Sequence, residues 1–158
     1  MHLIALLLAC SGEPDDDVSD DEPAAELGTG EVSFESLDDD DNIIIVFGPQ
    51  GGYHFNGSVR AAGINGGDAE NLEDPDNPLT TFRVFVDDEQ IDVGIDYRQG
   101  LDPTADGFEM VGRRVILDIA SDDALDGVEV VMEVEIEDVD GTVVTDSRTL
   151  IGKPHPLN

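Results

Sequence analysis

Residues 128–144 read VEVVMEVEIEDVDGTVV, and this stretch decides the fold class. Apolar side chains occupy every second position and glutamates most positions between them, which is the period of a β-strand with one buried face. Asp140-Gly141 follows at once and favours a type I′ hairpin turn, because glycine adopts positive φ angles without steric cost. The sequence therefore predicts a β-hairpin whose second strand covers residues 142–151.

The same two-residue period recurs along most of the chain before this hairpin. Residues 43–47 (IIIVF) are apolar at every position, which a strand buried on both faces explains. Turns rich in glycine, proline and aspartate separate the runs, and Ser121 to Gly127 can form one helical turn capped by Ser121. The other strand-like runs cover residues 32–34, 53–61, 82–86, 91–97 and 108–119.

Eight or nine short strands without a convincing helix predict an all-β protein. An immunoglobulin-like or fibronectin-III-like antiparallel β-sandwich is the natural arrangement, and a small barrel is the alternative. The chain lacks the Cys–Trp–Cys hallmark of true immunoglobulin domains. The resemblance to that family is therefore one of architecture alone.

The charge balance is strongly acidic. The 158 residues carry 38 Asp+Glu against 7 Lys+Arg, a formal net charge of −31. This excludes nucleic acid as a partner, because Lys and Arg must replace the counterions of phosphate. The composition resembles that of proteins from salt-tolerant organisms, and the alternative is a surface that binds cations or a basic partner. The single cysteine excludes a disulfide framework and a cysteine-cluster zinc site.

An apolar run of seven residues, 3–9, precedes Cys10 and is too short to span a bilayer. The tetrapeptide LLAC at 7–10 resembles the lipobox of bacterial lipoproteins, although His2 stands where that family carries Lys or Arg. The resemblance implies that residues 1–9 are a signal peptide and that Cys10 is acylated and becomes the first mature residue. It further implies that a lipid bilayer is a partner and that the protein resides in the cell envelope. Ser11, in place of Asp, resembles the outer-membrane sorting pattern of enteric bacteria, which implies the outer membrane or the periplasmic face rather than the inner membrane.

An acidic segment follows the cysteine. Residues 11–30 contain eight acids, no base, two prolines and three glycines. Repulsion between like charges and the scarcity of apolar side chains predict a disordered linker here. The expected organisation is a lipid-anchor cysteine with its linker over 10–30, a β-sandwich over 31–153 and a tail over 154–158.

The inventory for catalysis is thin, so we expect a non-enzymatic binding or structural module whose partner is an envelope protein or ligand. No Gly-x-Ser-x-Gly elbow surrounds any serine, and His54 is the sole histidine within 31–153. A hydrolase that uses two carboxylates is the enzymatic alternative, but aromatic platforms for sugar rings are scarce.

Residues 48–60, GPQGGYHFNGSVR, are the most distinctive part of the domain. Gln50, Tyr53 and His54 at a loop tip are the candidate recognition patch, since loops on a rigid sandwich often carry function. The alternative is a strand connection whose glycines satisfy backbone geometry. The stretch resembles uncharacterised acidic lipoproteins of myxobacteria, a resemblance that implies no activity.

The acidic turn at 38–41 and the long acidic loop at 65–78 offer candidate calcium ligands. Calcium takes clustered carboxylate and carbonyl oxygens from loops. The weak candidates are Asp68, Glu70, Asp74 and Asp76, although their spacing does not match an EF-hand. If these residues bind calcium, the protein is a calcium-dependent adhesion or scaffold module, which is the alternative function. If they do not, the loop is a solvated acidic segment. No other cofactor is expected.

Overall fold

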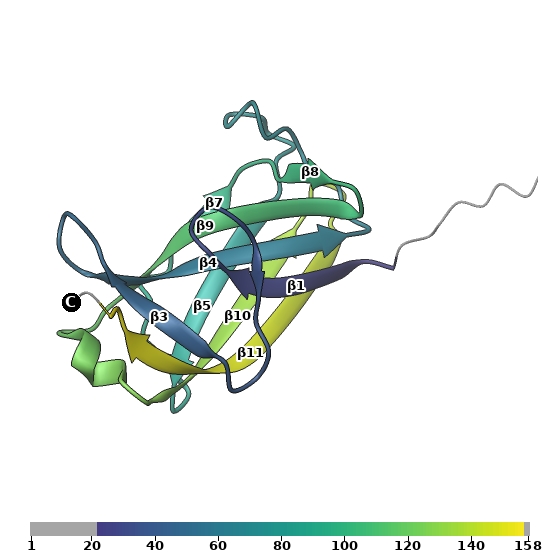
Figure 1. The fold of residues 1–158 in the computed structure, drawn as a ribbon. Helices are drawn as coiled ribbons and strands as arrows, with labels where there is room; N and C mark the ends of the chain where they lie inside the picture. The colour runs from purple at the N-terminus through teal and green to yellow at the C-terminus, as the bar shows by residue number, and fades with distance from the viewer. Residues whose placement is uncertain (1–21, 157–158) are drawn as a thin grey trace, which may run out of the picture.

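The computed structural model describes residues 22–156, and their fold is all-β (Figure 1). The strands join into one mixed sheet of eleven strands, and the single helical element is a 3-10 turn. In chain order the elements are β1 (Ala24–Thr29), β2 (Glu35–Ser36), β3 (Asn42–Phe47), β4 (Tyr53–Ala62), β5 (Leu79–Val86), β6 (Glu89–Gln90), β7 (Asp96–Arg98), β8 (Asp102–Thr104), β9 (Gly107–Leu117), η1 (Asp122–Leu125), β10 (Glu129–Glu137) and β11 (Val143–Pro154).

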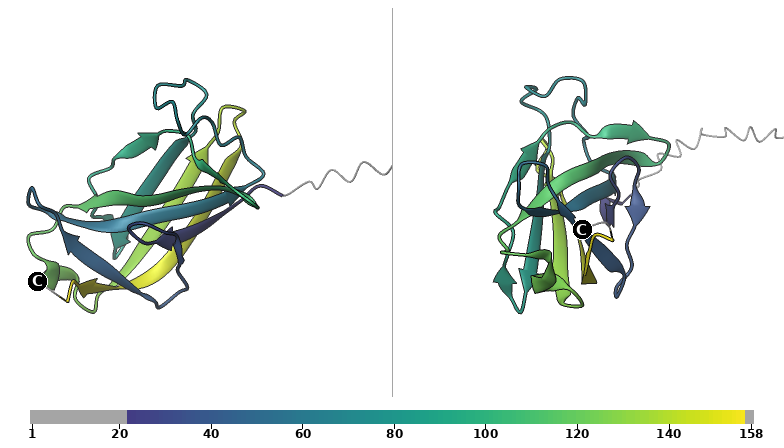
Figure 2. Two further views of the ribbon diagram at one scale, coloured as in Figure 1. Left: turned by 45° about the horizontal axis from the view of Figure 1, so that its top comes forward. Right: turned by 60° about the vertical axis from the view of Figure 1, so that its left-hand side comes forward.

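The sheet folds over into two layers, which the two views of Figure 2 show from different sides. In one layer β4 lies between β9 and the end-to-end strands β1 and β3, and in the other β10 lies between β5 and β11. A Cβ atom at Gly57 of β4 would meet the Phe82 ring at 3.0 Å and the Met132 methyl at 3.1 Å, so the layers pack face to face. The predicted β-sandwich is confirmed, and its immunoglobulin-like subtype stays a prediction.

Strand β3 belongs to both layers. Its residues 42–45 pair with residues 151–154 of β11, and its last two residues pair with the start of β4. The β3–β11 pair is parallel, so the expectation of a wholly antiparallel sandwich is wrong at this one place. Burial on both faces is also wrong for this strand, because Ile43 and Ile45 are buried whereas Ile44 and Phe47 are exposed.

The hairpin of β10 and β11 confirms the strongest sequence pattern and corrects its turn. Val130, Met132, Val134 and Ile136 are buried, and the four glutamates of the strand are exposed. The turn is a three-residue loop closed by Asp138 N–H donating to the Thr142 carbonyl, with positive φ at glycine alone. It is therefore not type I′. A two-residue turn with positive φ at both positions occurs instead between β5 and β6, at residues 87–88.

The domain begins earlier than the sequence predicts. Residues 24–29, expected in the disordered linker, form strand β1 and pair antiparallel with the second half of β4. Leu27 is fully buried, and its backbone N–H donates to the Asp146 carboxylate at 2.7 Å. The linker prediction is wrong over this strand, because a few small and apolar residues suffice to form a strand that pairs with the edge of β4. The predicted signal peptide, Cys10 and residues 11–21 lie outside the described residues.

Three smaller expectations are corrected. Residues 32–34 form no strand, and Val32 is 91% exposed. Residues 91–97 are not one strand. The Asp92 carboxylate accepts the N–H groups of Val84 and Gly94, and strand pairing resumes only at β7. The helical turn exists as η1, although the Ser121 side chain does not cap it. No helix within the described part of the chain is long and apolar enough to cross a membrane.

Candidate functional site

The outer face of the β4 layer carries a groove, which we call the His54 groove. Its floor comes from β3, β4 and β9, and the loops at 30–33 and 48–52 stand on either side of it. The groove has a volume of about 330 Å³, and a smaller hollow of about 100 Å³ adjoins it under the second loop. The residues that line the groove are Glu31, Val46, Phe47, Pro49, His54, Asn56, Gly112 and Arg114.

A β-bulge brings the first loop down onto the sheet. Gly57 pairs with Arg113 and Val59 with Met110, so β9 has one residue more than β4 at this place. Gly112 has a φ of +68°, and a Cβ there would lie 2.4 Å from the Glu31 carbonyl oxygen. Glycine at this position is therefore required for the close approach of the loop that carries Glu31.

The second wall is a tight glycine loop. Gly51 and Gly52 have φ angles of 84° and 88°, and the Gly48 N–H donates to the Gly52 carbonyl at 2.9 Å. At its base Tyr53 packs against Phe47, with ring centroids 5.3 Å apart. The loop is thus braced on both sides.

His54 and Arg114 are the polar groups that define the electrostatics of the groove. The His54 side chain is buried, and this burial together with the positive charge of Arg114 holds its pKa below the usual value, with Glu31 opposing. The imidazole is consequently neutral at pH 7. Among residues 22–156, no carboxylate oxygen lies within 4.0 Å of the Arg114 guanidinium. The same holds for Arg98 and Arg113, whereas Arg60, Arg83, Arg148 and Lys153 each pair with an acid.

The predicted recognition residues do come together. Gln50 is exposed at the loop tip, Tyr53 is half-buried, His54 is buried, and all three line the smaller hollow. Sequence reasoning missed Arg114, which also lines both spaces. Its place follows from the pairing of Asn56 with Arg114 across β4 and β9, and no local pattern in the sequence reveals that pairing.

The predicted calcium residues do not converge. In the loop between β4 and β5, Asp68 accepts the N–H of Glu70 at 2.9 Å, and Asp74 accepts that of Asp76 at 2.9 Å. These are Asx turns, in which the side chain shapes its own loop. Over the described ranges no group of three or more His, Cys, Asp or Glu side chains could hold a metal ion. The structure gives the calcium hypothesis no support.

Asn77 holds this acidic loop together and was not singled out by the sequence. It is fully buried, its Oδ1 accepts the N–H of Asp68 at 2.8 Å, and its Nδ2 donates to the Asn71 carbonyl at 2.8 Å. The first contact satisfies the Asp68 N–H, and the second adds to the bond that the Asn71 carbonyl accepts from the Asp74 N–H at 3.1 Å. One buried amide thus fixes a loop of many like charges.

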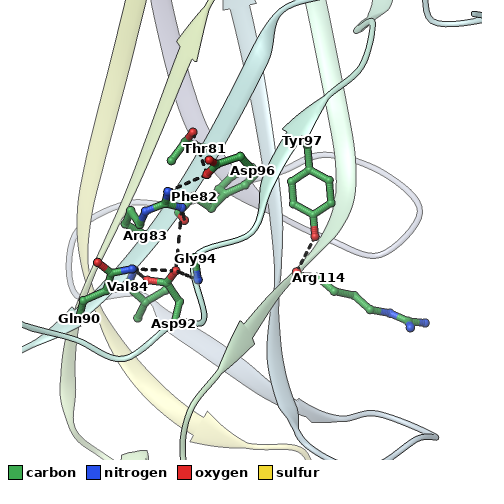
Figure 3. A network of polar contacts seen from close by, with 10 residues as sticks. All are labelled: Thr81, Phe82, Arg83, Val84, Gln90, Asp92, Gly94, Asp96, Tyr97 and Arg114. Carbon is green, nitrogen blue, oxygen red and sulfur yellow. Dashed lines mark hydrogen bonds and ion pairs between the residues drawn. The ribbon is translucent and has the colours of Figure 1, made fainter. Parts of the chain in front are cut away.

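A polar network closes the neighbouring edge of the sandwich, between β5 and β9 (Figure 3). The Arg83 guanidinium contacts Asp96 at 2.6 Å and lies 4.0 Å from Asp92, and the hydrogen bond from Arg83 holds the pKa of Asp96 below its usual value. The Tyr97 hydroxyl donates to the Arg114 carbonyl at 2.7 Å. The network is structural, and Tyr97 fixes the backbone from which Arg114 enters the groove.

No protein-family model matches the chain, and no curated protein matches it at a significant level.

Proposed function

We propose that this protein is a lipid-anchored protein of the cell envelope whose β-sandwich is a non-enzymatic binding or structural module. The anchor rests on the LLAC sequence that ends at Cys10. The binding role rests on the His54 groove, which has walls built from two loops and a cationic side chain without an acid partner in the described structure.

The single observation that favours a lipid anchor together with a binding role is the position of the groove. The glycine loop at 48–52 lies at the end of the sandwich opposite to the point where the chain enters at residue 22 (Figure 1). With β1 in the domain, the spacer is thirteen residues, Ser11 to Pro23, which reach at most about 43 Å. An anchor at Cys10 would therefore be attached at the end of the sandwich away from the glycine loop of the groove.

Metabolic labelling with an alkyne fatty acid tests the anchor. We expect the wild-type chain, expressed in a bacterium that processes lipoproteins, to take up the label and to fractionate with membranes. Cys10→Ser should abolish both, because the thiol that receives the lipid is gone. Ser11→Ala is the matched control and should label normally. An unlabelled wild-type chain in the cytosol would contradict the proposal.

A further inference from the structure

We infer that the His54 groove binds a small organic monocarboxylate, with Arg114 as the partner of the carboxylate and the apolar rim as the partner of the ligand's body. This inference names a ligand class for the binding role proposed above. It depends on the groove and not on the lipid anchor.

The first step is the charge of Arg114. A guanidinium presents several N–H donors in a planar fork that matches a carboxylate. In a chain with 38 acids this side chain still has no carboxylate within 4.0 Å among the described residues. Its backbone is held by the Tyr97 hydroxyl. The binding group is therefore fixed at its base and free at its tip.

The second step is the neutral, buried surface beside it. His54 is 7% exposed, and its Nδ1 faces the Gly48 backbone, where a Cβ would lie 3.8 Å away. The imidazole and the Asn56 amide add hydrogen-bonding groups to the floor without adding charge. A carboxylate on Arg114 would meet these groups on the same floor.

The side chains at the rim of the groove indicate the chemical character of the rest of the ligand. Phe47 is 53% exposed and Ile116 is 37% exposed, and Pro49 stands above them in the glycine loop. Large apolar side chains at the rim of a groove favour a ligand with an apolar body. Glu31 repels a second negative charge, so the groove selects one carboxylate per ligand and excludes polyanions.

The net charge of the chain does not prevent this binding. At about 0.15 M salt the Debye length is about 8 Å, so distant acids act weakly on a ligand in the groove. The local charges are then Arg114 from β9 and Glu31 from the loop after β1, and both act on His54.

The test is a titration of the full-length chain with benzoate, followed by NMR of the histidine rings. The chain has three histidines, His2, His54 and His155, so His54 can be assigned by His54→Gln. We expect benzoate to shift the ring signals of His54 alone and to raise its pKa, since a nearby anion stabilises the imidazolium. Benzyl alcohol, which has the same ring without the charge, should bind at least about ten-fold more weakly.

Three variants separate the contributions. Arg114→Gln should weaken benzoate binding about ten-fold or more, and Glu31→Gln should strengthen it. Arg60→Gln is the matched control, because Arg60 lies on the same strand as His54 but pairs with Glu109, and it should bind benzoate as the wild type does.

No response of His54 up to about 50 mM benzoate, equal binding of benzyl alcohol, or unchanged binding in Arg114→Gln would overturn the inference. Fatty-acid labelling at Cys10 is read separately. A chain that takes up the fatty-acid label but does not bind benzoate would contradict the ligand inference and support the anchor. A chain that binds benzoate but takes up no label would contradict the anchor and support the ligand inference.

Discussion

Single buried polar side chains fix the irregular parts of this molecule. The Asp138 carboxylate accepts the N–H groups of Asn65 at 2.8 Å, Asp140 at 3.0 Å and Thr142 at 2.8 Å. It therefore shapes its own hairpin turn and ties the loop after β4 to it. Burial by itself raises the pKa of Asp138, but these backbone hydrogen bonds outweigh burial and hold the pKa below its usual value.

Asp138→Asn should destabilise the protein by about 2 kcal/mol at pH 7, because an amide accepts fewer and weaker hydrogen bonds than a carboxylate. A folded-state pKa below the unfolded value means that the stabilisation is complete above about pH 4 and is lost as the pH falls through the folded-state pKa. The difference in the free energy of unfolding between Asp138→Asn and the wild type should therefore become smaller as the pH falls. Urea unfolding at several pH values measures it.

Asp140→Asn is the matched control for this change, since the Asp140 side chain is exposed in the same turn. It should alter the free energy of unfolding by less than about 0.5 kcal/mol. Equal effects of the two variants at pH 7 would show that the turn does not depend on the Asp138 carboxylate.

The elements show what a sequence reveals and what it hides. The alternation at 128–137 predicted β10 well, because apolar and polar residues alternate along a strand that has one buried face. Strand β1 was missed because its stability comes from a partner far along the chain, the pairing of Leu27 with Val59. The sequence singled out Tyr53 and His54, which are neighbours along the chain, although both lie at the start of β4 and not at a loop tip. It did not single out Arg114, which lies on a different strand.

Removing β1 tests whether it belongs to the domain. A chain that starts at residue 22 should unfold at the same urea concentration as the full-length chain. A chain that starts at residue 31, the boundary the sequence predicted, should lose at least about 3 kcal/mol, because the buried Leu27 side chain is gone and the edge of β4 is open. Equal unfolding midpoints for the two shortened chains would make β1 an accessory strand.

At the scale of the whole molecule, a filled sandwich carries a very large negative charge on its surface. The core takes apolar side chains from both layers, and the four glutamates of β10 point outward. Such a surface disfavours association between copies of the chain and is best tolerated where salt screens self-repulsion. The short strands β6, β7 and β8 cover sheet edges that would otherwise pair with other chains.

We propose that a lipid on Cys10 holds this sandwich at a membrane. The most direct measurement is the intact mass and N-terminal peptide of the protein extracted from the producing bacterium. We expect a chain that begins at Cys10 and carries a diacylglyceryl group on its sulfur. A chain that still begins at Met1, with a free thiol at Cys10, would contradict it.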